Sequence, residues 1–561
     1  MKPFKLLIVF ISCCCLIACS SHKNTIFKPT TTLTAFAKKQ TLTKAEKHQW
    51  HFKDIFEDSI PGVSLNRAYN FLKNKNGDTV IVAVIDSELD ISQKDLKDQI
   101  WKNVNEIPNN NIDDDNNGYI DDINGWNYVG SKKDNNIPYT SYEYVRIIKK
   151  YSSLFDDYNS LIEVPKRVIE DFRLYQKAYE KYNFEVEKIK LEIARFKRIE
   201  DRYIKAKLAV KKYFPKEDYT LIKLDSLKSI TIEEDEKKSI SNFAYYYKYE
   251  IDEKWVENRI NFENFKLNTL LNFNYNDRYL TNDNPHDIND FPYGNNNIQG
   301  TVKISHGTQI ASVIAAKRNN DIGIDGINDN VKIMSLSIAA VGNEFDKDIA
   351  LAIRYAVDNG AKVINLSLGK EFSMYPKWVN KALEYAESKD VLIVTSSGNN
   401  GLNIDKYEDY PTDNLNGIET VKNFIKVGNT SQNIDSTLVF STSNYGKKNV
   451  DIFAPGTKIS CLSRWGEVTD TGTSLSSAVV SSIASLLFSY YPNLTAAEVK
   501  EIILTSGNSI DLMVLKPYPI GEKRDPNKVP FSSLSKSGKI VNAYNALLMA
   551  EEVSKKKKRR N

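Results

Sequence analysis

Short apolar runs rich in β-branched residues recur along the chain and predict buried strands. They occupy residues 79–85, 331–338, 361–368, 390–397 and 424–429. Between these runs, residues 346–359 and 376–388 have the pattern of helices. Strands that are apolar on both faces alternate with helices in parallel sheets, because each crossover helix covers one face of the sheet. We therefore expect an α/β fold with a parallel sheet flanked by helices on both faces.

A long segment at residues 131–292 has a different pattern, rich in Lys, Glu, Tyr and Asn and poor in Gly. Its apolar residues recur at steps of three and four, which predicts a long amphipathic helix. They are Tyr182, Val186, Ile189, Ile193, Phe196, Tyr203, Ala206 and Val210. An isolated helix would leave this stripe exposed. We expect residues 243–249 and 255–271 to return along it in a coiled-coil-like hairpin, which is either a structural appendage or an arm that docks a partner.

The N-terminus has the pattern of a targeting segment. Lys2 and Lys5 precede an apolar run at residues 6–18 that is short for a transmembrane helix. The run ends in Leu-Ile-Ala followed by Cys19, which resembles the lipobox of bacterial lipoproteins. This resemblance implies acylation of Cys19 and a membrane anchor at the cell envelope, on the periplasmic face or the cell surface. An ordinary cleaved signal peptide is the alternative.

Cysteine content and charge limit the remaining possibilities. Removal of the signal leaves only Cys19 and Cys461, so we expect no structural disulfide and a buried Cys461 thiol. The chain carries 76 basic and 72 acidic side chains, which gives no reason to expect nucleic acid as a partner. The basic run at residues 555–560 predicts a solvated, disordered tail, with contact to anionic lipid as the alternative. The oligomeric state is not indicated.

Three short motifs carry the candidate chemistry. Asp86 directly follows the first predicted strand, and His306 and Ser474 each precede an apolar helical run. Side chains at the carboxyl ends of parallel strands, or in the first turn of a helix, project into the crevice where α/β proteins bind ligands. A serine hydroxyl becomes a nucleophile when a histidine takes its proton and a carboxylate orients that histidine. The motifs therefore favour a catalytic triad, which needs no cofactor.

In full, these motifs read VIVAVIDSELD, SHGTQIASVIAA and DTGTSLSSAVVSSIASLL, and they resemble those of the subtilisin-like serine peptidases, the subtilases. The resemblance covers residues 50–552 apart from the helical segment, and the chain order Asp, His, Ser excludes an α/β-hydrolase esterase. It implies a subtilisin-like parallel sheet with the helical segment as an inserted subdomain. It also implies a serine endopeptidase in which Ser474 forms an acyl-enzyme, His306 acts as general base and Asp86 orients it.

The same resemblance assigns binding roles. The stretch SSGNNG matches the family segment whose asparagine stabilises the oxyanion, which falls on Asn399. Ser367, Leu368 and Gly369 match the segment that pairs its backbone with an extended polypeptide substrate.

The chain also departs from the family pattern. The family usually has Gly at Glu88, His at Gln309, Gly at Ser312, Met at Leu475 and Pro at Ala478. These departures keep a second interpretation open, in which the chain is a weakly active or inactive lipoprotein that uses the fold as a binding scaffold. We further expect that Glu88, if it faces the cleft, raises the pKa of His306 and favours basic substrates.

An Asp-rich loop suggests a structural Ca²⁺ site. Asp113, Asp115, Asn117 and Asp121, or Asp122 in place of Asp121, offer side-chain oxygens at alternate positions, with Gly118 at the sixth place and a carbonyl at Tyr119. The full EF-hand spacing fails, because Asn124 stands where the bidentate Glu is needed. A hydrogen-bonded turn is the alternative.

These patterns divide the chain into six segments. They are residues 1–19, signal peptide and lipobox; 20–47, tether; 48–130, first part of the subtilase domain; 131–292, helical insertion; 293–552, second part of that domain; and 553–561, basic tail.

Overall fold

A computed structural model describes residues 33–34, 41–131, 135–158, 161–300 and 304–560 of the chain. Cys19 and the rest of the signal segment lie outside the described residues. The centre is a ten-stranded sheet with the order β1-β13-β16-β10-β9-β6-β5-β2-β4-β3. In that order the strands are Leu33–Thr34, Asn508–Asp511, Lys539–Ile540, Ile452–Pro455, Phe424–Thr430, Leu392–Ser396, Val363–Leu366, Val80–Asp86, Val331–Ser337 and Gly125–Asn127.

The predicted parallel sheet is confirmed. All pairings from β16 to β3 are parallel, and only β13 runs antiparallel to its neighbour β16. Strand β2 lies between β4 and β5, with Asp86 opposite Ser337 and Ile85 opposite Leu366. The carboxyl ends of three central strands therefore meet at one edge, where Asp86 stands.

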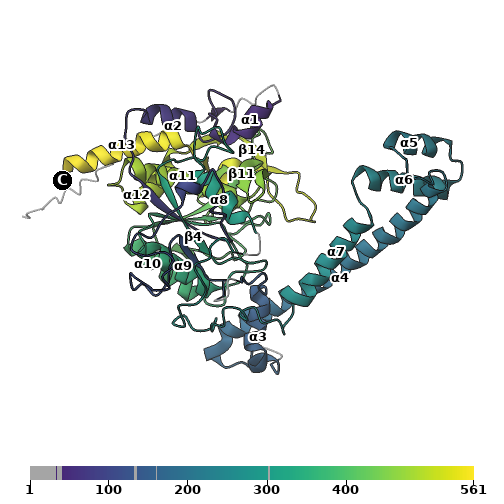
Figure 1. Ribbon diagram of the computed structural model, residues 1–561, viewed down its shortest axis with the longest axis horizontal. Helices are drawn as coiled ribbons and strands as arrows, with labels where there is room; N and C mark the ends of the chain where they lie inside the picture. Colours follow the sequence, from purple (N-terminus) through teal and green to yellow (C-terminus); the bar gives the residue numbers. More distant parts are fainter. Residues whose placement is uncertain (1–32, 35–40, 132–134, 159–160, 301–303, 561) are drawn as a thin grey trace, which may run out of the picture.

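Helices cover both faces of the sheet, as expected (Figure 1). One face packs against α8 (His306–Ala315), α11 (Thr473–Tyr490), α12 (Ala496–Ser506), α13 (Ala543–Arg560) and α2 (Leu65–Leu72). The other face packs against α9 (Asp346–Asp358) and α10 (Pro376–Ser388). Because each face has its own apolar cluster, the strands are buried on both sides, which explains their continuous apolar runs.

The central helix α11 is rich in Ser and Ala, which lets it approach the strands closely. Among the described residues it is the one helix long and apolar enough to span a membrane, but it is 89% buried as a core helix of the fold. Its serine hydroxyls are paired inside the protein: Ser481 bonds to Asn365 of β5 and Ser476 donates to the Ala454 carbonyl of β10. The small side chains thus hold the start of α11 against the sheet.

A helical arm extends away from this body (Figure 1). It contains α3 (Glu143–Phe155), η3 (Lys166–Val168), α4 (Ile169–Lys211), α5 (Leu221–Ile230), α6 (Glu234–Lys248), α7 (Glu253–Phe265) and the π-helical turn η4 (Lys266–Leu270). Helix α4 has 43 residues, which corresponds to a length of about 65 Å. Helix α7 runs beside α4, and α5 and α6 lie at the outer end.

The apolar stripe of α4 is covered as predicted. Ile189 lies in a buried cluster near the base of the arm, and Tyr203 packs at the outer end against Phe243 of α6. Between these two clusters the ring of Phe196 meets Trp255 of α7 edge-on at 5.9 Å. The expected helical hairpin is therefore present, with both later segments returning along α4.

Buried charges fasten the base of the arm to the sheet. Glu143 of α3 is paired with Arg146 and lies 3.3 Å from the ammonium of Lys370, which in turn lies 2.8 Å from Asp346. All four side chains are at most 6% exposed. Burial raises the pKa of Glu143, but the charges of Arg146 and Lys370 outweigh it and lower this pKa to about 2. Loss of one partner would leave a buried charge unpaired, so α3 is held rigidly.

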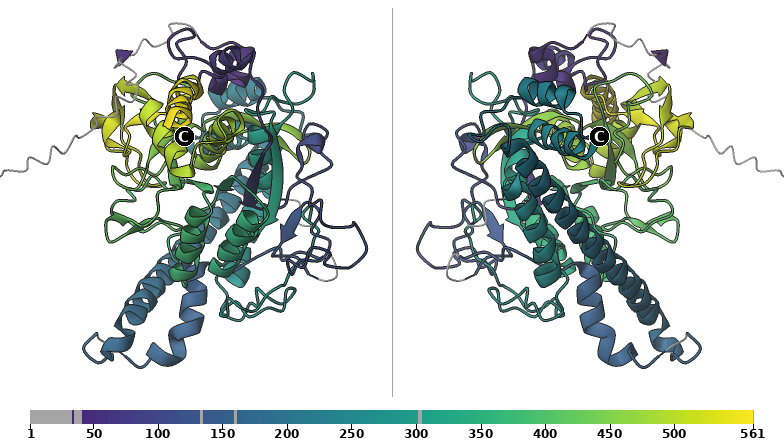
Figure 2. Two further views of the ribbon diagram at one scale, coloured as in Figure 1. Left: turned by 90° about the vertical axis from the view of Figure 1, so that its left-hand side faces the viewer. Right: turned by 90° about the vertical axis from the view of Figure 1, so that its right-hand side faces the viewer.

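The C-terminal basic run differs from the expectation of a disordered tail. Residues 555–560 continue α13, which lies beside α2 (Figures 1 and 2). The ammonium of Lys557 donates to the Glu498 carboxylate and to the Asn493 carbonyl, both at 2.7 Å. Contacts with α12 and its preceding turn therefore stabilise a helix that charge repulsion alone would disfavour.

Candidate active site

The three motif residues come from different elements at the same edge of the sheet. Asp86 is the last residue of β2, His306 the first of α8, and Ser474 the second of α11. Although 220 positions separate Asp86 from His306 in the sequence, the fold brings their side chains into contact.

The contact between Asp86 and His306 is well formed. Nδ1 of His306 lies 2.7 and 2.9 Å from the two carboxylate oxygens of Asp86. Ser87 adds a second link, since its Oγ accepts from the Gly307 amide at 3.0 Å. A carboxylate only accepts hydrogen bonds, so the neutral imidazole carries its proton on Nδ1 and leaves Nε2 as the basic nitrogen. The Asp86 carboxylate is 3% exposed and the His306 ring 37%, so the ring remains accessible to substrate.

Several charges act on the pKa of His306. Burial lowers it, but the charge and hydrogen bond of Asp86, with the further charges of Asp470 and Glu344, outweigh burial and raise it above its ordinary value. Asp470 ends strand β12 (Gly466–Asp470), and Glu344 lies in the loop after β4. The His306 ring therefore sits in a negative environment, which stabilises the charged form of the imidazole.

The Ser474 hydroxyl has a different partner in this structure. Its Oγ donates to the Ser367 carbonyl at 3.4 Å, and no hydrogen bond within the described residues joins it to His306. Long or misaligned catalytic hydrogen bonds are common in ligand-free enzymes. To become reactive, the Ser474 hydroxyl must turn from the Ser367 carbonyl toward Nε2 of His306.

Asn399 stands beside Ser474 with its amide oriented. Its Oδ1 accepts from the backbone N–H of Thr473 at 2.9 Å and from the Thr473 hydroxyl at 3.1 Å. Because a backbone N–H only donates, Oδ1 must face Thr473, which leaves Nδ2 as a donor. The backbone N–H of Ser474 lies in the first turn of α11 and has no partner within the described part of the chain. Two donors therefore flank the hydroxyl at the positive end of a helix.

The predicted substrate-binding residues line a cavity of about 340 Å³ that ends at Ser474. Ser367, Leu368 and Gly369 follow β5, and Asn399 follows the neighbouring strand β6. The structure thus brings Asn399, Ser474 and the segment 367–369 to one cavity. Tyr144 of α3 and Asp409 also line it, and sequence motifs did not indicate either residue because they lie in unrelated stretches of the chain.

The expectation for Glu88 was wrong. Its side chain is 2% exposed and turns away from the cleft: Oε1 accepts from Asn136 at 2.8 Å, and Oε2 lies 3.7 Å from the Arg464 guanidinium. The carboxylates that raise the pKa of His306 are those of Asp86, Asp470 and Glu344. Sequence adjacency to Asp86 was misleading, because the chain turns sharply after β2 and directs Glu88 toward another loop.

Comparison with known proteins decides the family. The sequence profile of the subtilase family matches residues 77–528, which is more than half of the chain. The chain belongs to the subtilase family.

Individual relatives match only part of this chain. This subtilase is 36% identical over 207 residues to a cell wall-associated protease of Bacillus subtilis, a match that covers 36% of this chain and 21% of the relative. It is 34% identical over 186 residues to thermitase of Thermoactinomyces vulgaris, a match that covers 33% of this chain and 61% of the relative. The matches therefore span less than two thirds of these relatives' lengths. The solved structure of a protease from Pseudoalteromonas arctica matches with 23% sequence identity and a TM-score of 0.36. The match covers 44% of this chain and 70% of the chain in that structure.

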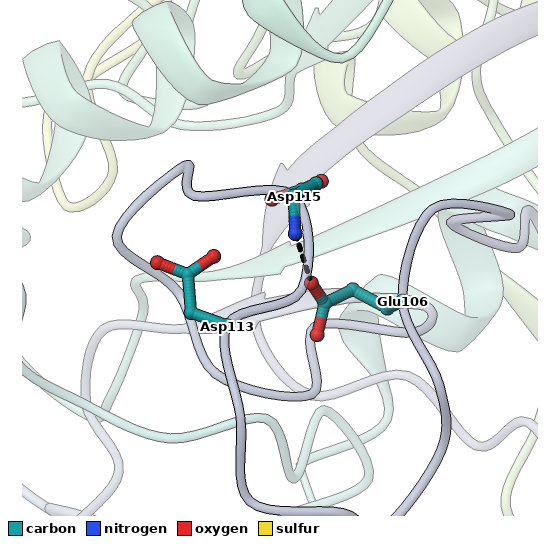
Figure 3. Close-up of side chains that lie close together, drawn as sticks. All are labelled: Glu106, Asp113 and Asp115. Carbon is teal, nitrogen blue, oxygen red and sulfur yellow. Dashed lines mark hydrogen bonds between the residues drawn. The ribbon is translucent and has the colours of Figure 1, made fainter.

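The Asp-rich loop of the subtilase gathers three carboxylates (Figure 3). Oxygen atoms of Glu106, Asp113 and Asp115 all lie within 4.8 Å of one another. Burial raises the pKa of Glu106, and the nearby charge of Asp122 adds to this, although backbone donors lower it. Hard oxygen ligands that repel one another fit a divalent cation such as Ca²⁺. Glu106 lies seven positions before Asp113, outside the spacing of a calcium-loop motif, so the sequence did not indicate it.

The other expected ligands lie differently. Asp121 accepts from the backbone N–H groups of Asn110 and Asn111, at 3.2 and 2.9 Å, and is not part of the three-carboxylate group. Asn117 donates its amide to Asp115 at 3.2 Å, and its Oδ1 accepts from the Tyr119 amide at 2.7 Å. The loop is thus also the hydrogen-bonded turn that was the alternative.

The charges around His306 predict a pH response. A general base must be neutral to accept a proton, so a peptidase that uses His306 as its base should gain activity as pH rises through the pKa of the ring. Asp470→Asn removes a charge that raises this pKa, so the acid limb of kcat/KM should move to lower pH. Peptide hydrolysis measured across pH 5–9 would detect the shift.

Glu88→Gln is the matched control, since it removes an equal charge that faces away from the ring. Its acid limb should coincide with that of the unmodified enzyme. An unmoved limb in Asp470→Asn, or a larger shift in Glu88→Gln, would contradict this electrostatic account.

Proposed function

We propose that this subtilase is a serine endopeptidase that hydrolyses peptide bonds through an acyl-enzyme. The observation that carries the proposal is the bifurcated hydrogen bond from His306 Nδ1 to the Asp86 carboxylate, at the same sheet edge as Ser474 and Asn399. A binding scaffold has no need for an oriented imidazole and for two unused N–H donors beside a serine, whereas acyl transfer requires an oriented base and oxyanion donors.

The proposed reaction has two half-reactions. Ser474 Oγ attacks the substrate carbonyl carbon while its proton moves to Nε2 of His306. The oxyanion formed accepts from Nδ2 of Asn399 and the backbone N–H of Ser474. The C–N bond then breaks, His306 gives its proton to the leaving amine, and the acyl group stays on Ser474. Water repeats the sequence with His306 again as base, which releases the acid and restores the hydroxyl.

The proposed substrate is an extended polypeptide. Gly369 stands between the end of β5 and the bridge that joins Lys370 to Tyr410, and its backbone groups have no hydrogen bond within the described residues. Such a segment accepts a substrate strand by backbone pairing. Tyr144 of α3 lines the adjoining cavity. We therefore propose that the arm narrows access and makes the enzyme selective rather than generally degradative.

The scaffold interpretation has one observation in its favour, the hydrogen bond of Ser474 Oγ to Ser367 instead of His306. The departures from the family pattern support it less. Ser312 is fully buried and bridges α8 to β11 (Ile459–Ser463), accepting from the Leu462 amide at 2.9 Å. Ala478 is fully buried within an unbroken α11. Both positions are packed, and the Asp86–His306 contact forms in their presence.

Asn399→Ala tests the proposed oxyanion site. Loss of one oxyanion donor costs about 3 to 4 kcal/mol of transition-state stabilisation, so kcat should fall roughly 100- to 1,000-fold with little change in KM. Steady-state hydrolysis of a fluorogenic peptide would measure both parameters.

Asn433→Ala, in an exposed turn, is the control and should retain full activity. Ser474→Ala should remove all hydrolysis above background. Equal kcat in Asn399→Ala and the unmodified enzyme would argue against Asn399 as an oxyanion donor, and hydrolysis by Ser474→Ala would argue against the nucleophile.

We further propose a lipid anchor at Cys19, supported by the lipobox pattern. Cys19→Ser should move the protein from the membrane fraction to the soluble exported fraction or block its processing. Cys15→Ser lies within the same signal and should leave the protein in the membrane fraction. Membrane retention of Cys19→Ser, with normal signal cleavage, would contradict the anchor.

We also propose that Ca²⁺ binds at Glu106, Asp113 and Asp115 and stabilises the loop that leads to β3. A ligand present at 100 times its Kd stabilises the folded state by about 2.7 kcal/mol. Chelation with EGTA should therefore lower Tm in thermal unfolding, and added Ca²⁺ should restore it. Asp113→Asn with Asp115→Asn should make Tm insensitive to both. An unchanged Tm of the unmodified protein on chelation would refute the site.

A further inference from the structure

The cavity beside Ser474 has a polar group that the proposed chemistry does not use. We infer that this cavity binds a Lys or Arg side chain of the substrate, on the amino side of the cleaved bond, and that Oδ1 of Asp409 accepts a hydrogen bond from its cationic head. The inference rests on the proposed peptidase function and names its substrate class.

Part of the cavity wall is apolar. Leu368, Phe372, Leu402 and Ile404 contribute aliphatic and aromatic surface, and Tyr144 adds a ring from the arm. Tyr144 and Phe372 meet edge-on with their centroids 5.8 Å apart. Such walls suit the long methylene stem of a lysine or arginine, which buries its stem and keeps only its head polar.

Asp409 supplies a carboxylate oxygen between the two sides of the cavity. A Cβ placed on Gly369 would lie 3.3 Å from Asp409 Oδ1, and one placed on Gly398 would lie 3.7 Å from it. Both glycines lie along the cavity that ends at Ser474. Because neither carries a side chain, Oδ1 stays open to a bound group between them.

The two oxygens of Asp409 have unequal partners. Oδ2 accepts from the ammonium of Lys426 at 2.6 Å, whereas Oδ1 has no hydrogen-bond partner among the described residues. The Lys426 side chain is 3% exposed and Asp409 is 11% exposed, so the ion pair lies beneath the cavity. Burial raises the pKa of Asp409, and the Lys426 charge opposes this rise. Lys426 thus holds the carboxylate in one orientation and leaves Oδ1 as an unused acceptor.

The other charges around the cavity favour a cation. Glu371 and Glu408 also line it, and their partners Lys181 and Lys177 approach from α4, at 2.8 and 2.6 Å. Lys370 lines the cavity, but its ammonium is engaged by the buried carboxylates of Glu143 and Asp346. Each lining carboxylate is thus paired with one lysine, and the one basic residue of the lining, Lys370, offers no free ammonium to an acidic side chain.

An apolar side chain of similar size would contact the apolar part of the wall but would leave Oδ1 of Asp409 without a donor. It would displace water from Oδ1 without supplying a donor, and an unsatisfied buried acceptor is costly. Sites built to hydrogen-bond a polar group discriminate strongly against ligands that lack it. A basic side chain supplies both the apolar stem and a charge-assisted donor.

Peptides that differ only at the residue before the cleaved bond test this inference. Purified full-length enzyme is assayed with matched internally quenched peptides carrying Lys, Arg, Leu, Phe or Glu there, and mass spectrometry identifies the cleaved bond. We expect kcat/KM for Lys or Arg to exceed that for Leu or Phe by about ten-fold or more, with Glu the poorest. A preference for Leu or Phe would overturn the inference.

Asp409→Asn should reduce the ratio of kcat/KM for Lys to that for Leu by about ten-fold or more. Asp409→Asn combined with Lys426→Met removes both charges and should give the same low ratio. The double variant thus separates the loss of cation recognition by Asp409 from the effect of leaving Lys426 without its partner. Glu408→Gln, on the exposed rim, should change the ratio much less. An Asp409→Asn ratio equal to that of the unmodified enzyme would also overturn the inference. Absence of any cleavage dependent on Ser474 would instead refute the proposed peptidase function.

Discussion

The contact between the Asp86 carboxylate and the His306 ring is the constraint on which the rest of the molecule depends. It forms only because β2 is central in a parallel sheet and α8 returns to the carboxyl end of that strand. The chain between these two residues adds the edge strand β3 and the whole arm before it comes back to the carboxyl end of β2. The position of the arm beside the cleft is therefore a consequence of where the chain is interrupted, and Figure 1 shows α3, at the base of the arm, against the body.

The base of the arm is joined to the site by charge. Glu143 and Arg146 of α3 contact both loops of the cleft: Glu143 reaches Lys370 after β5, and Arg146 donates to the Glu344 carbonyl after β4 at 2.9 Å. Buried ions are stable only when every partner is present, so these loops and α3 form one rigid unit. The loop after β4 carries Glu344, one of the carboxylates that raise the pKa of His306, and the loop after β5 carries the proposed substrate segment. The proposed substrate selection therefore depends on the position of the arm through these few contacts.

The sequence predicted the parts of this arrangement that follow from local pattern. Apolar runs located the strands, and the spaced stripe of α4 located the hairpin, because each pattern requires burial of one face or both. The motifs located Asp86, His306, Ser474 and Asn399 at element boundaries. Most of what the sequence could not predict depends on contacts between distant segments. The direction of Glu88, the roles of Tyr144 and Asp409 in the cavity, and the helical C-terminus are each set by a partner far along the chain. Glu106 lies near Asp113 in the sequence, but the fold of the loop rather than a motif spacing brings their carboxylates together.

Intact-mass analysis after reaction with a serine-directed phosphonate tests whether Ser474 is an activated nucleophile. We expect a single adduct per chain, mapped by digestion to the peptide that contains Ser474, and no adduct in Ser474→Ala. An unmodified mass in the unaltered protein, or an adduct that persists in Ser474→Ala, would show that Ser474 is not an activated nucleophile and would favour a binding scaffold.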